Sequence, residues 1–294
     1  MNVYDIVTER MVELLNQGVV PWRKPWASDG RPPMNLVSGK AYTGVNSWLL
    51  NCAGYGSPYW LTLSQANERG ATLREGERYS IAVFTKQWTP KEPRASAPVD
   101  KDGKPKALRV LRYYRVYNAE QFTGLDYPRP QARALDFNPI DAAEKIVSGM
   151  PAPPTLQHIE ARAYYQRSTD LVNIPPRESF EAEPDYYSTL FHELVHATGH
   201  ETRLARAQEA TSKMDGAYAR EELIAELGGA YLCNHAGIAH RTLANSAAYC
   251  ASWIARLKGD SKLIVQAASR ASKAANWILG ELPDDKGHTE TEND

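Results

Sequence analysis

Cysteine is scarce in this sequence, and its scarcity excludes two kinds of small scaffold. The chain has 294 residues and three cysteines, Cys52, Cys233 and Cys250, none of which lies near another. An odd number of isolated cysteines supports neither a disulfide framework nor a Cys-x-x-Cys metal knuckle. Because disulfides are typical of oxidising compartments, we expect this protein in the cytoplasm.

Long apolar runs are absent as well. No stretch approaches the roughly 20 apolar residues that a membrane-spanning helix needs. The first residues form an amphipathic repeat that contains Val3, Ile6, Met11, Leu14 and Leu15. Such a repeat does not resemble the apolar core of a signal peptide. We therefore expect no membrane among the partners.

A large net charge is also lacking, because 34 Lys and Arg nearly balance 35 Asp and Glu. The two signs are unevenly distributed, however. Residues 1–130 hold 18 Lys and Arg against 12 Asp and Glu, a balance of +6, and the remaining residues hold 16 against 23, a balance of −7. A basic first half suits a polyanion, and the acidic second half indicates a different task.

The length exceeds that of most single domains, so we expect two domains in the α+β class. Residues 1–127 are expected to form a basic α+β module, residues 128–137 a linker, and residues 138–294 a mostly helical domain with a small antiparallel sheet. Residues 89–107 are expected to form a polar, mobile hairpin tip or an insertion, and residues 283–294 a disordered acidic tail. Apolar periodicity predicts helices at 2–16, 63–70, 140–150, 186–199, 221–232, 246–257 and 261–279, and strands at 79–88, 108–118, 158–165 and 170–175.

The most informative stretch is His192-Glu193-Leu194-Val195-His196, which lies in a mostly apolar run without proline. Residues four apart lie on one face of a helix, so His192 and His196 can offer two imidazole nitrogens to one metal ion. Glu193 can take a proton from a water that the metal holds. The pattern predicts a zinc site, or a site for another divalent ion such as Mn²⁺, with Glu193 as the catalytic base.

A third metal ligand is needed. A histidine ten residues after the first is not available, because that position is Thr202. A later helix carries Glu221, Glu222 and Glu226, and the last two share a face. Two inward carboxylates repel each other unless a cation lies nearby. We expect Glu226 to bind the metal and Glu222 to support a ligand histidine, with the reverse assignment open, and Glu221 to be solvated.

The basic half carries a second pattern, in which aromatic and cationic side chains are interleaved. Aromatic rings stack on unpaired bases while cations meet phosphates, so this pattern favours single-stranded DNA over duplex. The alternative, that the tryptophans fill the core, stays open. The candidate DNA-binding residues are Trp22, Arg23, Lys24, Trp26, Lys40 and Tyr42.

The two short strands expected at 158–165 and 170–175 precede the metal helix. An exposed edge strand can bind an extended peptide, which adds its own backbone as a further strand. Tyr164 and Tyr165 are both candidates for a hydroxyl near the metal.

Several stretches from both halves carry a resemblance to a known family. They are Pro21–Trp26, Gly39–Asn46, Trp60–Ala66, Tyr187–His200 and Glu221–Cys233, continued by Ala248, Ser252 and Trp253. In these stretches the chain resembles the ArdC-type antirestriction proteins of conjugative plasmids. The resemblance implies an N-terminal domain that binds single-stranded DNA and a C-terminal zincin-like metallopeptidase domain. It also implies protection of incoming plasmid DNA from host restriction enzymes.

Two functions are compatible with these observations. In the first, the protein binds single-stranded DNA and cleaves an unknown protein substrate at its zinc site. In the second, it is a non-catalytic protein that covers single-stranded DNA, and its metal site is structural or vestigial. Glu193 favours the first function, because a structural metal site needs no base beside it.

Overall fold

The computed structural model describes residues 2–23, 31–88, 108–129, 139–206, 216–238 and 247–281. The expected hairpin tip, the acidic tail and residues 130–137 of the expected linker lie outside these ranges. The helices and small sheets of the described chain confirm the α+β class. Among the described residues, no helix combines the length and the apolar character needed to cross a membrane.

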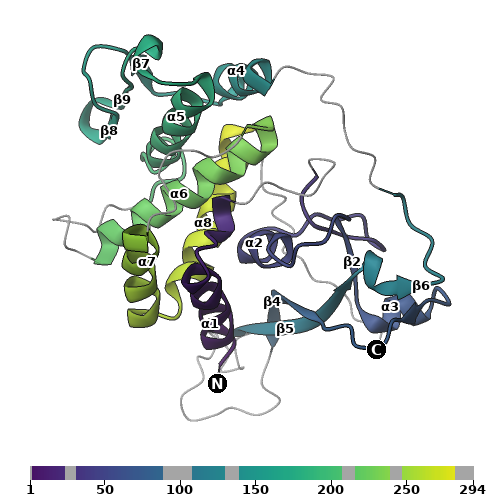
Figure 1. The fold of residues 1–294 in the computed structure, drawn as a ribbon. Coiled ribbons are helices and arrows are strands. Elements are labelled where there is room, and N and C mark those ends of the chain that lie inside the picture. Colours follow the sequence, from purple (N-terminus) through teal and green to yellow (C-terminus); the bar gives the residue numbers. More distant parts are fainter. Residues whose placement is uncertain are drawn as a thin grey trace, which may run out of the picture.

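One group of helices, which we call the helical body, occupies the left and centre of Figure 1. Its central helix is α6, which contacts α4, α5 and α8. All residues from Leu223 to Cys233 are buried, as expected for a helix that is apolar on almost every side. The helical body consists of α1 (Val3–Asn16), α2 (Val45–Asn51), α4 (Pro139–Gly149), α5 (Glu183–Ala197), α6 (Gly216–Ala236), α7 (Ala247–Gly259) and α8 (Leu263–Ile278).

Local sequence explains where several of these helices begin and which faces they bury. Asn2 caps α1, because its side chain accepts from the Asp5 N–H at 3.0 Å and its own N–H donates to the Asp5 carboxylate at 3.1 Å. Pro184 lies in the first turn of α5, where its missing N–H has no partner to lose. The buried positions of α8 recur every three or four residues, which gives that helix one packed face.

A second group of elements, the sheet lobe, lies at the right of Figure 1. Its main sheet has the strand order β1-β2-β5-β4, and β4 and β5 form a long antiparallel pair in which Ile81 lies opposite Arg115. Both long strands were predicted from the alternation of their side chains. The lobe contains β1 (Met34–Asn35), β2 (Tyr59–Leu61), α3 (Leu63–Asn67), β3 (Thr72–Leu73), β4 (Ser80–Trp88), β5 (Leu108–Asn118) and β6 (Phe122–Thr123).

A separate three-stranded sheet lies beside α5 and has the order β7 (Thr155–Gln157), β9 (Leu171–Asn173) and β8 (Tyr164–Gln166). β8 is antiparallel to β9, as expected, whereas β7 was not predicted and is parallel to β9. β8 is shorter than the strand predicted at 158–165. The residues before it form a loop, and the buried side chain of Asn173 makes four hydrogen bonds to the backbone of that loop.

Three early elements, α1, η1 (Pro21–Arg23) and α2, pack against helices that come much later in the sequence. The rings of Trp22 and Trp253 meet edge to face with centroids 6.1 Å apart, and those of Trp48 and Tyr231 do so at 6.2 Å. One buried cluster therefore contains side chains from α1 and α2 together with side chains from α4 to α8. This shared cluster joins elements from both sides of the expected boundary at residue 127.

Candidate metal centre

Helix α5 presents the two histidines of the motif on one face. The Nε2 atoms of His192 and His196 lie 3.2 Å apart, and the ring planes are inclined by 77°. Both side chains are largely buried, with 21% and 16% of their surface exposed. A spacing of four residues on a helix produces this arrangement without help from the rest of the fold.

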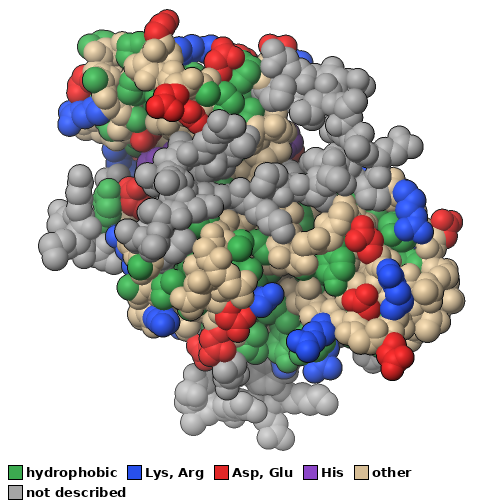
Figure 2. Space-filling model, viewed as in Figure 1, with side chains coloured by type: hydrophobic (Ala, Val, Ile, Leu, Met, Phe, Trp, Pro, Cys, Tyr) green, Lys and Arg blue, Asp and Glu red, His purple; other side chains and the backbone are tan. Residues whose placement is uncertain are grey.

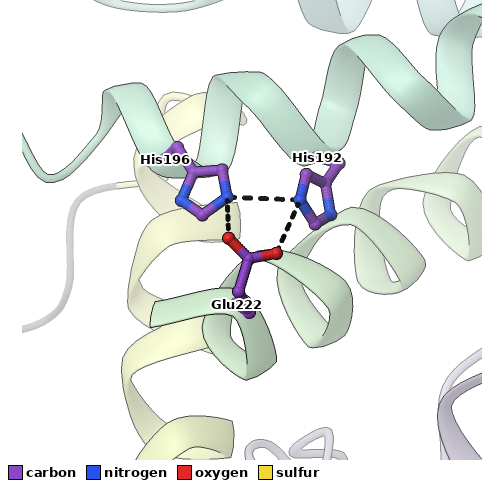
Figure 3. Close-up of side chains that lie close together, drawn as sticks. All are labelled: His192, His196 and Glu222. Carbon is purple, nitrogen blue, oxygen red and sulfur yellow. Dashed lines mark hydrogen bonds and ion pairs between the residues drawn. The ribbon is translucent and has the colours of Figure 1, made fainter. Parts of the chain in front are cut away.

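Helix α6 places a carboxylate beside the two imidazole nitrogens. The Glu222 oxygens lie 3.7 Å from Nε2 of His192 and 3.6 Å from Nε2 of His196. Figure 3 shows the three side chains pointing toward one another from the two helices. Their potential ligand atoms lie within 4.8 Å of one another. Two imidazole nitrogens and one carboxylate oxygen are a donor set that fits zinc and other divalent ions, so these residues suit a metal.

The expected third ligand, Glu226, is not part of this group, which contains Glu222, the residue of the reverse assignment. Glu226 lies one helical turn further along α6 and is only 6% exposed, inside the helical body. There its charge acts on the thiol of Cys233. Residues four apart share a face but differ by about 6 Å along the helix axis, so only one of them reaches the level of the histidines.

The close approach of α5 and α6 depends on two adjacent glycines. A Cβ atom on Gly228 would lie 2.8 Å from a methyl carbon of Val195. A Cβ atom on Gly229 would lie 3.4 Å from the backbone nitrogen of His192. The hydrogen of Gly228 therefore leaves room for the Val195 side chain, and Gly229 lies in close contact with the backbone of α5.

Glu221 was expected to be solvated, and the structure corrects that expectation. Its carboxylate lies 3.7 Å from Nδ1 of His196 and forms a two-pronged ion pair with Arg206, at 2.7 and 3.3 Å. Arg206 also donates to the carbonyl of Val195 and the hydroxyl of Thr198. Burial alone would raise the pKa of Glu221, but the hydrogen bonds to His196 and Arg206 lower it to about 2.

The Glu221 carboxylate can therefore orient the His196 ring through Nδ1, while Nε2 faces Glu222. A carboxylate on the second ring nitrogen fixes the tautomer and makes the first nitrogen a better metal ligand. The paired acids at the start of the α6 pattern were visible in the sequence. Which of them faces His196 could not be found there, because that depends on the rotation of α6.

Glu193, the expected base, is 8% exposed and follows the first histidine on α5. Its helix, α5, packs against β8. Burial raises the pKa of Glu193 to about 7, and the nearby charge of Glu222 acts in the same direction. A carboxyl group with such a value can both accept and release a proton near neutral pH.

The two tyrosines of β8 direct their hydroxyls away from the metal centre. Tyr164 donates to Glu160 at 2.8 Å, and Tyr165 donates to Asp170 at 2.9 Å. Asp170 in turn pairs with Arg203, whose guanidinium is buried and also donates to the carbonyl of Ala197. This chain of contacts joins β8 and β9 to the C-terminal end of α5, and it occupies the hydroxyl of Tyr165.

The six candidate DNA-binding residues differ in where they lie in the structure. Trp22 is completely buried and Tyr42 is 6% exposed, with its ring against Phe84 at 6.1 Å. A buried ring cannot stack on a base, so both are core residues in this structure. Lys40 is exposed. Lys24, Trp26 and the side chain of Arg23 lie outside the described part of the chain.

The sheet lobe has other arginine and tyrosine contacts that the sequence did not single out. Arg115 lies over the ring of Tyr79 at 4.6 Å, and Arg129 lies over the ring of Tyr127 at 4.3 Å. On the face drawn in Figure 2, the described Lys and Arg side chains of this lobe alternate with Asp and Glu. On that face the basic balance of the first half does not gather into one continuous positive patch.

Two family models match the chain. One describes the N-terminal domain of the anti-restriction factor ArdC and matches residues 1–117, and the other describes a zincin-like metallopeptidase and matches residues 141–270. Among curated proteins, the uncharacterized protein y4eC of Sinorhizobium fredii (strain NBRC 101917 / NGR234) is 32% identical over 96% of this chain and 93% of its own length. Two DNA primases TraC of Escherichia coli are 35% and 34% identical over 94% of this chain. The chain spans only 27% and 20% of their lengths.

Solved structures give the same result over the whole chain. The metal-free crystal structure of the antirestriction ArdC protein from the R388 plasmid is 34% identical, with a TM-score of 0.74 over 96% of this chain and 98% of that one. The Mn(II)-bound structure of the same protein is 33% identical, with a TM-score of 0.73 over 97% and 100% of the two chains. An identity of this size over nearly the full length of both chains confirms the resemblance found in the sequence, and the chain belongs to the ArdC family of antirestriction proteins.

Proposed function

We propose that this protein protects incoming plasmid DNA during conjugation by binding single-stranded DNA and cleaving a protein at a metal-dependent peptidase site. The observation that carries the proposal is the group formed by His192, His196 and Glu222, with the buried Glu193 beside it. The same group without a base would suit a structural metal. The proposal also includes a cytoplasmic location, a protein substrate and a role during conjugation.

His192, His196 and Glu222 would hold the metal ion. We propose zinc, because imidazole and carboxylate ligands with room for a further group are typical of catalytic zinc sites. Manganese is the alternative, since a solved structure of R388 ArdC contains Mn(II). When bound, such an ion polarises a carbonyl group and acidifies water.

The remaining steps belong to the side chains and backbone of this chain. Glu193 would accept a proton from the attacking water and pass it to the leaving amine. Glu221 and Arg206 would hold His196 in the orientation that the metal needs. β8, at the edge of its sheet and packed against α5, would pair with an extended peptide.

The DNA-binding part of the proposal rests on charge and on family membership. Residues 1–130 carry an excess of six positive charges, and the family model for residues 1–117 describes the N-terminal domain of ArdC. The candidate side chains that remain are Arg23, Lys24, Trp26 and Lys40. Binding through phosphates would weaken as the salt concentration rises, because each contact releases counterions.

The second candidate function is a DNA-binding protein that protects by occlusion alone. The excess positive charge supports it without any use of the metal centre. In the first function DNA binding instead raises the local concentration of a peptidase near proteins on the same strand. The two functions therefore share the DNA site and differ only in whether Glu193 is needed.

The test is the transfer of unmodified plasmid DNA into a restricting host that carries the full-length protein or its Glu193→Ala variant. The peptidase proposal expects the variant to keep its fold, metal and DNA binding but to lose protection. Retained protection would replace that proposal with occlusion. As the complementary control, charge reversal at Arg23 and Lys24 should reduce protection under both functions.

A further inference from the structure

The ribbon of β4 and β5, labelled in Figure 1, carries two exposed aromatic rings on one face. Tyr79, just before β4, is 45% exposed, and Tyr113 of β5 is 39% exposed. Side chains alternate along a strand, so Tyr113 and Arg115 share a face, on which they lie opposite Val83 and Ile81. Tyr79 reaches the same face, because the Arg115 guanidinium lies over its ring at 4.6 Å. We call the three side chains Tyr79, Arg115 and Tyr113 the ring face.

The β4 side of this face is anchored in the core. Val83 is 7% exposed and belongs to the buried cluster of the helical body. Its backbone N–H donates to the Asn46 side chain on α2 at 2.7 Å, and its carbonyl accepts from the same side chain at 2.8 Å. Helix α2 therefore holds β4 in place, whereas Tyr113 on β5 stays accessible. A backbone that is already fixed loses little freedom when a ligand binds to the side chains it carries.

The cation of the ring face is not neutralised by a carboxylate, and a similar pair elsewhere in the chain shows the difference. Arg162 lies over the ring of Tyr164 at 5.0 Å, but its guanidinium also pairs with Glu160 at 2.9 Å. Within the described ranges, no acidic side chain pairs with Arg115, and its guanidinium makes no hydrogen bond. Its five N–H donors are therefore available to an anionic ligand.

Accessible rings with a cation between them fit single-stranded nucleic acid. Any base can stack on an aromatic ring, because every base has a π-face, and a guanidinium can bind a phosphate oxygen with its N–H donors. Residues two apart on a strand are separated by about 7 Å, so Tyr113 and Arg115 can contact a base and a neighbouring phosphate. In a duplex the bases stack on each other, so their faces are closed to the rings. The excess of six positive charges in residues 1–130 favours the same partner.

We propose that Tyr79 and Tyr113 stack on bases of single-stranded DNA and that Arg115 binds a phosphate of the same strand. This inference rests on the DNA binding proposed above and names a surface for it that the sequence motifs did not include. The Tyr79 ring attracts the guanidinium of Arg115 and so keeps the charge beside the rings. A purely structural pair would stabilise the ribbon and leave the affinity for DNA unchanged.

The first test measures the binding of fluorescein-labelled oligo(dT) to the full-length protein by fluorescence anisotropy. Tyr113→Leu and Tyr79→Leu should each raise Kd about 5–150-fold, the effect of losing one base–aromatic stack. Tyr113→Phe keeps the ring and should bind within about twofold of the wild type. An oligo(dA)–oligo(dT) duplex should bind Tyr113→Leu as well as it binds the wild type, because its bases do not stack on the ring.

The second test concerns the phosphate contact. Arg115→Gln removes the cation, so the slope of log Kd against log salt concentration should fall by about 0.7, the value of one contact to a single strand. Tyr164→Leu is the matched control, because it removes the ring of an arginine–tyrosine pair outside the sheet lobe and should change neither affinity nor slope. An unchanged slope for Arg115→Gln would refute the phosphate contact.

Photocrosslinking tests the stacking without any substitution. On irradiation, 5-iodouracil joins to an aromatic ring that it stacks on, so an oligo(dT) strand that carries it should give crosslinked peptides with Tyr79 or Tyr113. Crosslinks confined to other residues would refute the ring face, and so would wild-type affinity in the double variant Tyr79→Leu/Tyr113→Leu. Either result would leave DNA binding by the protein intact. If the wild type does not bind oligo(dT), the proposed DNA binding and the ring face fail together.

Discussion

The helical body and the sheet lobe solve their packing in different ways. The body brings α5, α6 and α8 together through small side chains, such as Gly228, Gly229 and Ala271. Both parts also pack aromatic rings edge to face, as in Trp22–Trp253 in the body and Tyr55–Trp60 in the lobe. Small residues let helix backbones approach closely, which fixes the distance between groups on two helices. In the lobe, the exposed Arg129 lies over the ring of Tyr127.

The proposed metal site and the proposed DNA binding make different structural demands. A metal site needs ligand atoms held to within a fraction of an ångström, and the close-packed helices supply that rigidity. Binding a flexible single strand needs cations and accessible rings rather than a fixed distance. The division does not follow the order of the chain, since α1, η1 (Pro21–Arg23) and α2 come first in sequence and pack in the helical body.

The largest effect should come from a residue whose assignment changed from the DNA surface to the core. Trp22→Ala should lower the free energy of unfolding by about 3–5 kcal/mol, because the indole is completely buried against Trp253. Urea denaturation of the full chain would measure this loss of stability. Trp22→Phe, which keeps an aromatic ring, should cause a smaller loss. If Trp22→Ala weakens DNA binding at unchanged stability, Trp22 belongs to the DNA surface after all.

The next effect concerns the two carboxylates of α6. Glu222→Gln should weaken metal binding more than about 100-fold, which exceeds the usual effect of losing an outer partner. Glu226→Gln should leave metal affinity within about tenfold of the wild type, because Glu226 lies one turn away from the histidines. Metal analysis after dialysis against a weak chelator compares the two. The reverse result would restore the assignment made from the sequence.

Asp170, which helps to link β8 to the C-terminal end of α5, should make the stability of the fold depend on pH in acid. Burial alone would raise the pKa of Asp170, but Arg203 and Tyr165 outweigh it and the pKa is lowered from 3.8. A lowered folded-state pKa means that ionised Asp170 stabilises the fold above that ordinary value, and that this contribution is lost as the pH falls through the lowered one. Asp170→Asn should therefore cost about 1.5–3 kcal/mol at neutral pH. Its stability should then fall less steeply than that of the wild type below pH 3.8. Parallel slopes for the two proteins would show that Asp170 contributes nothing.

The smallest effect tests the close approach of the helices directly. Gly228→Ala should destabilise the protein by about 1–3 kcal/mol and weaken metal binding, because the new methyl group overlaps Val195 and moves α6 away from α5. Gly259→Ala is the control, since a Cβ atom there meets nothing within 4 Å. Thermal unfolding measures both variants. Equal unfolding temperatures for Gly228→Ala and Gly259→Ala would mean that the two helices tolerate a wider spacing than we infer.

The sequence by itself determined the features that depend on local spacing. The pair His192 and His196, with Glu193 between them, follows from the helical period, and the structure keeps both imidazoles on one face. The alternation in β4 and β5 and the apolar repeats of α1 and α8 were read in the same way. The antiparallel pairing of β8 and β9 was predicted too, because a short turn joins neighbouring strands.

The tertiary structure alone decided which residues meet across elements. Glu221, Glu222 and Glu226 are all acidic residues of one predicted helix, and the packing of α6 on α5 brings Glu222 to the two histidines and Glu221 to Nδ1 of His196. Likewise, the position of Trp253 on a distant helix turned Trp22 from a candidate surface ring into a core residue. Local spacing fixes the direction of a side chain relative to its own helix, but the partner it meets depends on how helices pack, which is a property of the whole chain.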